Sequence, residues 1–270
     1  MKIGIMASQI SGHLTFQPSS ITGLKAWYDP SDTTSITSSS GAVSQINDKS
    51  GNGYNLVQAT SAYKPTTGTR TINSLNVLDF TSDSTYISNN TTSNWTFMSN
   101  TSGSSIFVVF KLDTLGKRNF IYNTGYNPIG ELSTGTYFSS LITSGYVDHL
   151  LGDGAGNYNF LNRPSSGYAA STNYYVTVLG DPGNATAANR SKIYINTGSV
   201  LATNTQTATA GTAAPVRGFT LGATYDGSSG GPYITGAIDG VIGEVIMYTG
   251  VLSGADQTTV KNYLATKWGI

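Results

Sequence analysis

The chain of 270 residues contains no cysteine and few charged side chains. Disulfide bonds therefore contribute nothing, and a domain of this length buries enough apolar surface without them. Charged residues make up 10 % of the sequence, against about 25 % in ordinary globular proteins. Basic and acidic residues number 14 each, so the formal charge is zero. Because no basic face is visible to displace counterions from phosphates, the sequence argues against nucleic acid as a partner.

Long apolar runs are also missing. No stretch approaches the ~18 apolar residues of a membrane-spanning helix. The first ten residues turn polar too soon for the core of a signal peptide. We therefore expect no membrane insertion, and synthesis in a cytoplasm.

The residues needed for common enzymatic sites are scarce. Glycoside hydrolysis requires two carboxyl groups about 5 to 10 Å apart, yet the only glutamates are Glu131 and Glu244. Asp239 lies five positions before Glu244, so the two would face opposite sides of a regular strand. His13 and His149 have no acid or histidine at a metal-ligand spacing. The sequence predicts no catalytic residues and no enzymatic activity, with hydrolysis kept as a remote alternative.

What the chain does contain is typical of an all-β protein. It is rich in Gly, Ser, Thr, Asn and Tyr, which suit short strands joined by tight turns. About twelve or more such strands can be recognised. Residues 237–248 predict a central strand with apolar groups on both faces, with Ile242, Glu244, Ile246 and Tyr248 on one of them.

A single helix is predicted at the end of the chain. Ser253 and Asp256 resemble a capping box, and one face of the run to Trp268 is apolar. Together these patterns predict one all-β domain, a two-sheet antiparallel jelly-roll sandwich with one short C-terminal α-helix.

Several sequence motifs resemble one known group of domains. WYDPSD at residues 27–32, VSQINDKSGNG at 43–53 and LNVLDF at 75–80 are followed by KIYIN at 192–196, GAIDGVIGEVIMY at 236–248 and YLATKWG at 263–269. This order resembles the concanavalin A-like, laminin-G-like jelly-roll domains of phage virion and bacterial surface proteins. The likeness spans residues 21–270 and departs from the pattern between residues 117 and 168. It implies the fold, whereas such domains serve as lectins, glycosidases and structural modules.

Two acidic positions have a structural and a functional interpretation. Glu244 lies within an apolar run, and we favour a structural carboxylate that accepts hydrogen bonds from backbone or from a Tyr or Lys neighbour. Asp48 and Asn52 lie in a dense turn and, with Asp29 or Asp32, could supply oxygen ligands to calcium. The alternative is a turn in which Asp48 and Asn52 bond to their own backbone, and we favour it. Calcium is therefore a low-ranked cofactor, and no other cofactor is predicted.

The functional hypotheses rest on the resemblance and on the aromatic residues. Our main hypothesis is a non-enzymatic phage virion structural protein, in a head decoration, fibre or tail, that displays the jelly-roll on the particle. Residues 1–20 would be an arm that binds other virion proteins, or else a tail on its own domain, and residues 21–270 the jelly-roll. We expect a homo-oligomer. The alternative is an adhesin module that binds host-surface glycan by stacking on tyrosines such as Tyr126, Tyr146, Tyr158 and Tyr168.

Overall fold

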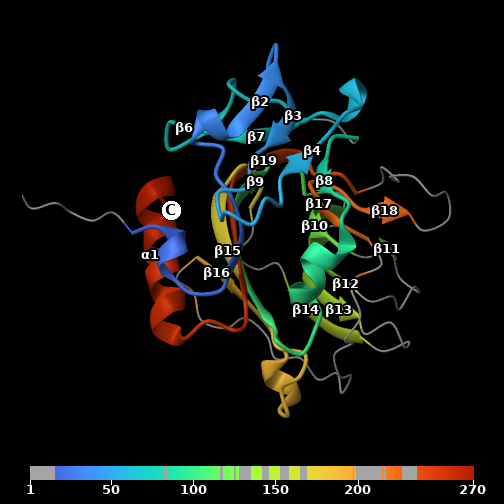
Figure 1. The fold of residues 1–270 in the computed structure, drawn as a ribbon, viewed down its shortest axis with the longest axis vertical. Coiled ribbons are helices and arrows are strands. Elements are labelled where there is room, and N and C mark those ends of the chain that lie inside the picture. Colours follow the sequence, from blue (N-terminus) through green and yellow to red (C-terminus); the bar gives the residue numbers. More distant parts are fainter. Residues whose placement is uncertain are drawn as a thin grey trace, which may run out of the picture.

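The computed structural model describes residues 16–81, 84–115, 118–124, 126–127, 135–141, 146–152, 158–164, 169–196, 198, 215, 217–226 and 236–270. Within these residues, two β-sheets pack face to face and one α-helix covers the outer side of one sheet (Figure 1). The prediction of a two-sheet antiparallel sandwich with a C-terminal helix is confirmed. None of the described helices is long and apolar enough to cross a membrane.

The sheet beneath the helix has six strands, and its two central members carry the longest ladder. In spatial order its strands are β1 (Leu24–Tyr28), β19 (Gly240–Thr249), β9 (Ser104–Leu112), β15 (Asn173–Gly180) and β16 (Ser191–Ile195), with β7 (Leu78–Phe80) also paired to β19. All of these pairs are antiparallel. The first strand and the last strand of the described chain are therefore neighbours in the sheet.

The second sheet has nine strands. In spatial order they are β14 (Tyr158–Pro164), β13 (Tyr146–Gly152), β12 (Gly135–Leu141), β10 (Arg118–Asn123), β17 (Phe219–Leu221), β8 (Ile87–Asn89), β4 (Leu56–Val57), β3 (Ala42–Ile46) and β2 (Ile36–Ser39). All of its pairs are antiparallel.

Short elements complete the described fold. The two-stranded ladders are β11 (Tyr126–Asn127) with β18 (Tyr225–Asp226), which is parallel, and β5 (Thr71–Ile72) with β6 (Leu75–Asn76). The 3-10 turns are η1 (Pro18–Ser20), η2 (Thr33–Ser35), η3 (Ser61–Tyr63), η4 (Thr92–Met98) and η5 (Ala187–Asn189).

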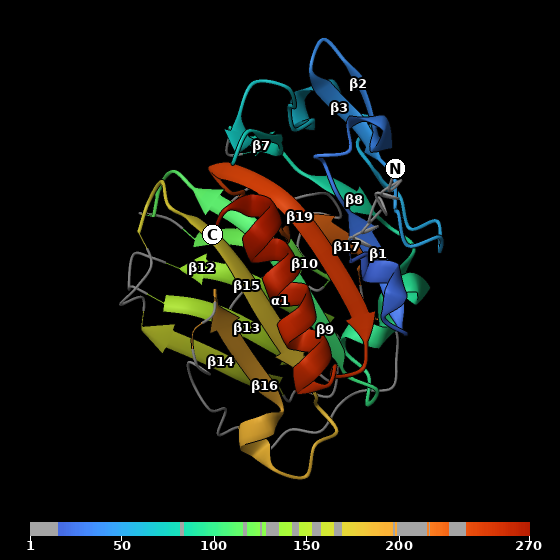
Figure 2. The same cartoon turned by 90° about the vertical axis from the view of Figure 1, so that its left-hand side faces the viewer.

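Two apolar clusters hold three layers together. The larger one lies between the sheets and includes Phe80, Trp95 and Phe110. The other lies between the six-stranded sheet and the helix and includes Phe107 and Trp268. Figure 2 shows the helix lying over the strands of this sheet. Because strands of the middle layer contribute to both clusters, they are apolar on both faces, as the run at 237–248 predicted.

The helix α1 (Gly254–Trp268) begins and ends as the sequence predicted. The Ser253 hydroxyl oxygen accepts a hydrogen bond from the Asp256 amide at 3.1 Å and donates one to the Asp256 carboxylate at 2.8 Å. The helix ends at Gly269 in the left-handed conformation, at φ 67°. Val260 and Leu264 are buried against the sheet.

The last part of the predicted N-terminal arm packs on the domain. The ring of Phe16 meets that of Tyr263 edge to face at a centroid distance of 5.4 Å. The Tyr248 hydroxyl donates to the Pro18 carbonyl at 2.9 Å. Residues 16–20 therefore lie against the helix and its sheet, and residues 1–15 lie outside the described residues.

Candidate functional site

Glu244 lies at a β-bulge in the central strand β19. The pairing of β19 with β9 shifts register between Ile242 and Glu244. Before the bulge, Val241 faces the helix and Ile242 faces the other sheet, and a Cβ added at Gly243 would meet Trp268 on the helix side. The prediction that Ile242 shares a face with Glu244 is therefore wrong, because the extra residue changes the alternation. The expectation that Asp239 and Glu244 face opposite sides of the strand assumed a regular strand between them, and it fails for the same reason.

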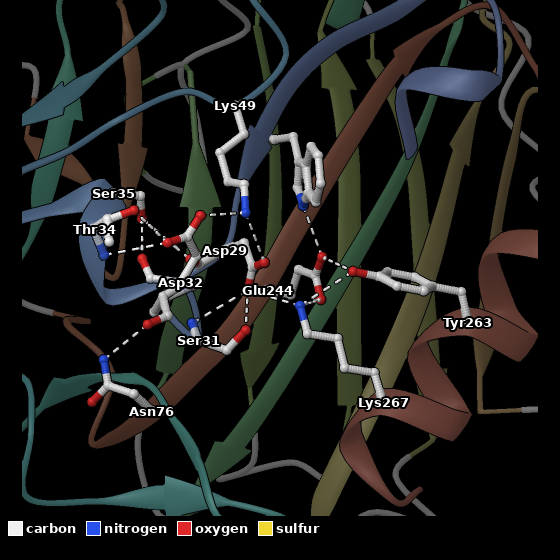
Figure 3. Close-up of polar contacts among 12 residues, drawn as sticks. Asp29, Ser31, Asp32, Thr34, Ser35, Lys49, Asn76, Glu244, Tyr263 and Lys267 are labelled. Carbon is white, nitrogen blue, oxygen red and sulfur yellow. Dashed lines mark hydrogen bonds and ion pairs between the residues drawn. The ribbon is translucent and has the colours of Figure 1, made fainter. Parts of the chain in front are cut away.

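Four donors converge on the fully buried Glu244 carboxylate, and Figure 3 shows Tyr263 and Lys267 among them. One oxygen, Oε1, accepts from the Trp27 indole at 2.7 Å and from the Tyr263 hydroxyl at 2.9 Å. The other, Oε2, accepts from Lys267 at 2.9 Å and from the Trp268 indole at 2.8 Å. The prediction of a structural carboxylate is confirmed. It joins β1, β19 and α1 by charge-assisted hydrogen bonds.

The burial of the Glu244 carboxylate and its full set of hydrogen bonds determine what it can do chemically. Burial raises the pKa of Glu244 above its ordinary value, and the Lys267 ammonium partly offsets this effect. Because each oxygen already has two donors, neither is free to exchange a proton with an external substrate. The geometry therefore suits an internal anchor between layers.

A row of alternating charges extends from this anchor to the surface. Lys267 also donates to Asp29 at 2.8 Å. Lys49 binds Asp29 at 3.2 Å and Asp32 at 2.7 Å, and its ammonium lies 4.6 Å from the Trp27 ring centroid. Burial alone would raise the pKa of Asp29, but the contacts with Lys267, Ser31 and Lys49 bring it below the ordinary value.

The turn at Asp48 is organised by the side chain of that residue. Its carboxylate accepts from the backbone amides of Trp27 at 2.9 Å, Ser50 at 2.9 Å and Tyr54 at 3.0 Å, and from the Ser50 hydroxyl at 2.7 Å. The amide nitrogen of Asn52 donates to the same hydroxyl and to the carbonyls of β1. The structural interpretation of this turn is confirmed for Asp48, whereas the Asn52 side chain binds the neighbouring strand β1 instead of its own backbone.

The three calcium candidates therefore do not form one cluster of free oxygens. Asp48 and Asn52 share the turn, whereas Asp29 binds the ammonium groups of Lys49 and Lys267. Over the described part of the chain, no group of three or more His, Cys, Asp or Glu side chains is arranged to hold a metal ion. Calcium binding at Asp48 stays a prediction.

A different surface is defined by the register of β12, β13 and β14. His149 on β13 is buried, and its Nδ1 lies 2.6 Å from the hydroxyl of Ser191 in the opposite sheet. His149 therefore occupies the inner face, and alternation places positions 148 and 150 on the outer face. The positions directly opposite them complete cross-strand rows on that face. These outer rows are Leu141–Tyr146–Pro164, Ser139–Asp148–Asn162, Tyr137–Leu150–Phe160 and Gly135–Gly152–Tyr158.

The outer rows include two of the tyrosines named from the sequence. Tyr146 and Tyr158 occupy strand positions there, and Tyr126 is in the small ladder β11–β18. Tyr168 lies outside the described residues. The outer rows combine a polar row with aromatic positions on either side.

The sequence analysis missed the partners of Glu244. A lone acid in an apolar strand requires donors, and the terminal helix offers Tyr263 and Lys267 four residues apart, on one helical face. This spacing was the available signal for two of the four donors. Nothing local indicated Trp27, which is 217 positions from Glu244.

Comparisons with known proteins show the fold. No family model matches the chain, and no curated protein matches its sequence. The receptor-binding domain of botulinum neurotoxin D is similar over 91 % of this chain and 53 % of that structure, with a TM-score of 0.58 and 15 % identity. The K499G mutant of NanB sialidase from Streptococcus pneumoniae is similar over 66 % of this chain and 26 % of its own, with a TM-score of 0.50 and 14 % identity. This chain thus spans about half of the neurotoxin structure and a quarter of the sialidase structure.

A third structure is a sialidase CBM40 from Ruminococcus gnavus bound to α2,3-sialyllactose. It is similar over 60 % of this chain and 83 % of its own, with a TM-score of 0.47 and 19 % identity. At such identities the likenesses concern the fold. The neurotoxin and NanB structures agree with the β-sandwich fold implied by the sequence motifs, and none of the three structures is described as a phage protein.

Proposed function

We propose that this protein is a non-catalytic receptor-binding module that recognises glycan through the outer rows of β12–β14. The observation that carries the proposal is the row Ser139–Asp148–Asn162, which has aromatic positions in the rows on both sides. Sugar rings present apolar C–H faces and hydroxyl edges, and protein sites bind them with aromatic faces and a few polar groups. A polar row between aromatic rows offers both within one face.

The fold and the internal chemistry support the same assignment. Over 91 % of its own length, the chain is similar in fold to part of a structure described as a receptor-binding domain. The buried acid that a hydrolase would use is fully occupied by structural donors. These features favour binding over catalysis.

The charge of the outer rows suggests which glycans would bind. Asp148 is the acidic position in the central row, and Arg163, at an adjacent position on β14, belongs by alternation to the inner face. A carboxylate placed close to another carboxylate is unfavourable. We therefore expect neutral sugars to be preferred over sialylated ones.

The test is binding of the full-length protein to a panel of neutral and sialylated oligosaccharides and to extracted surface polysaccharide. The double variant Asp148→Ala, Asn162→Ala should lower the affinity for the best neutral ligand at least tenfold. The matched control Asn262→Ala, at an exposed position of α1, should bind normally. Failure of every glycan to bind, or equal binding by both variants, would refute the proposal. The same binding measurement is repeated with a chelator. Loss of glycan binding in the chelator would favour a calcium ion bound at the turn of Asp48.

The virion setting is a second proposal, which rests on the resemblance of the sequence motifs to phage virion proteins. Residues 1–15 would bind other virion proteins, because the chain is anchored on its own domain from Phe16 onward. A truncation that starts at Phe16 keeps these anchoring contacts, whereas removal of residues 1–20 deletes part of them. The shorter deletion should abolish incorporation into particles and leave the unfolding temperature unchanged. Normal incorporation of the truncated protein would exclude this role for residues 1–15. Light scattering of the full-length and truncated proteins would give the oligomeric state.

A further inference from the structure

The ammonium of Lys267 lies between two carboxylates in a largely enclosed position. Its nitrogen is 2.8 Å from Asp29 Oδ1 and 2.9 Å from Glu244 Oε2 (Figure 3). The side chains are 18 % exposed for Lys267, 6 % for Asp29 and 0 % for Glu244. The rings of Trp268 and Tyr263 lie 5.3 Å and 5.4 Å from the nitrogen. An amine, a carboxyl group that can react with it and a buried carboxylate that can carry protons are thus held together.

We propose that Lys267 and Asp29 become joined by an intramolecular isopeptide bond, with Glu244 as the proton carrier. An ammonium–carboxylate pair and the corresponding amine–carboxylic acid pair contain the same number of protons. The neutral form is the one that reacts, and it is the minor form, because the contacts with Lys267, Ser31 and Lys49 lower the pKa of Asp29, so the reaction should be slow. The amine is then the nucleophile, and its proximity to the acid replaces a bimolecular encounter.

The reaction balances without any other reactant. One proton passes from Lys267 to Asp29 Oδ1, which gives a free amine and a carboxylic acid. The amine nitrogen attacks Asp29 Cγ, and the negative charge of the tetrahedral intermediate develops on Oδ2. Glu244 takes a second proton from the nitrogen and delivers it toward the Oδ1 hydroxyl. The Cγ–Oδ1 bond breaks, one water molecule leaves, and Glu244 returns to its starting state.

The surroundings of Asp29 favour it over Glu244 as the acceptor. Lys49 donates to Asp29 Oδ2 at 3.2 Å, where it would stabilise the developing oxyanion. The Ser31 hydroxyl donates to Oδ1, the oxygen that leaves. Glu244 is fixed by two indoles and a tyrosine hydroxyl, so it cannot turn its carbon toward the amine.

A second lysine–aspartate pair in the same network provides an internal comparison. Lys49 and Asp32 are only 2.7 Å apart, but their side chains are 23 % and 35 % exposed. The second carboxylate on Lys49 is Asp29, at 3.2 Å, which is also held by Lys267. Water therefore keeps this pair ionised, and we expect it to remain an ion pair.

The first experiment is intact-mass spectrometry of the purified full-length protein. The bond removes one water, so the mass should be about 18 Da below that of the unmodified chain. An Asp–Gly step such as Asp239–Gly240 can also lose water by cyclisation, so fragment mapping is needed. The expected result is a branched peptide that contains both Asp29 and Lys267.

Variants distinguish the reaction from a structural ion pair. Lys267→Arg and Asp29→Ala should restore the full mass, and Glu244→Gln should restore it while the circular dichroism spectrum shows a folded sandwich. Lys261→Arg, on the same helix but over the ring of Tyr194, should keep the loss of water. An unmodified mass in the wild-type protein after prolonged incubation, or mapping of the lost water elsewhere, would overturn the proposal. If Glu244→Gln fails to fold, the Lys267→Arg and wild-type peptide maps still decide.

Discussion

Replacing Gly243 with alanine should disturb the contact between the central strand and the terminal helix. Gly243 is the bulge residue of β19, and its Cα faces the indole of Trp268. A Cβ at this position would lie 2.9 Å from Val109 Cγ1 and 3.0 Å from two ring atoms of Trp268. Carbon atoms pack best at about 3.5–4.0 Å. The added methyl group must therefore push one neighbour away.

Neither neighbour can move without loss. Val109 and Trp268 are both fully buried, and the indole nitrogen of Trp268 is tied to Glu244 at 2.8 Å. Overpacking of this kind costs about 1–3 kcal/mol. The lower entropy of the unfolded alanine chain offsets about 0.4–1 kcal/mol. We expect a net destabilisation of about 1 kcal/mol.

The assay is chemical denaturation followed by tryptophan fluorescence and circular dichroism. The matched control is Gly254→Ala at the start of α1, where a Cβ meets no atom within 4 Å. The control should be neutral or stabilise the protein by up to about 1 kcal/mol, since alanine favours the helix. Adding Trp268→Leu to Gly243→Ala should cost less than the two single changes predict together, because the clash is gone. Equal stability of Gly243→Ala and wild type, or strict additivity of the double variant, would refute the reasoning.

Three other changes test the polar interior. Glu244→Gln is made in a Lys267→Arg background, which excludes a cross-link. It leaves two of four buried donors without an acceptor and should lower the free energy of unfolding by about 2–6 kcal/mol in chemical denaturation. A cost below about 1 kcal/mol would contradict the role of Glu244 as an anchor between the layers. Burial lowers the pKa of His149 from 6.5 to about 3, so the unfolded chain binds the proton first and the free energy of unfolding should fall by about 2 kcal/mol between pH 7.5 and 5. His149→Asn should remove this slope and His13→Gln should keep it, while the raised pKa of Glu244 acts in the opposite direction. Asp48→Ala removes three hydrogen bonds within the turn and one to Trp27 of β1, and it should cost about 2–4 kcal/mol in thermal unfolding. Calcium that stabilises wild type but not this variant would establish the metal site.

The parts of the fold that were predictable follow from local patterns. The helix was recognisable because Ser253 and Asp256 satisfy its first amides and its apolar positions recur at helical spacing. The central strand was recognisable because apolar residues occupy both faces. Each of these signals lies within about twenty residues, so no knowledge of the topology was needed.

The bulge at Gly243 and the network around Lys267 were not predicted, for different physical reasons. A glycine inside a strand is a recognised signal of a bulge, but the shift depends on the partner strand β9, which the sequence alone does not identify. The approach of Lys267 to Asp29 joins positions 238 residues apart. It follows from β1 pairing beside β19 and from α1 returning over that sheet, which is a property of topology.

The distribution of charge connects the anchor with the proposed binding face. Asp29, Asp32 and Glu244 are engaged by Lys49 and Lys267 on the helix side of the sandwich. The outer rows of β12–β14 belong to the other sheet and contain mostly neutral positions. Recognition there would depend on stacking and neutral hydrogen bonds, which salt screens little, whereas attraction between exposed charges fades beyond a Debye length of about 10 Å at 0.1 M salt. Glycan affinity should therefore change less than twofold between low and high salt, and a strong salt dependence would favour a charged surface elsewhere on the molecule.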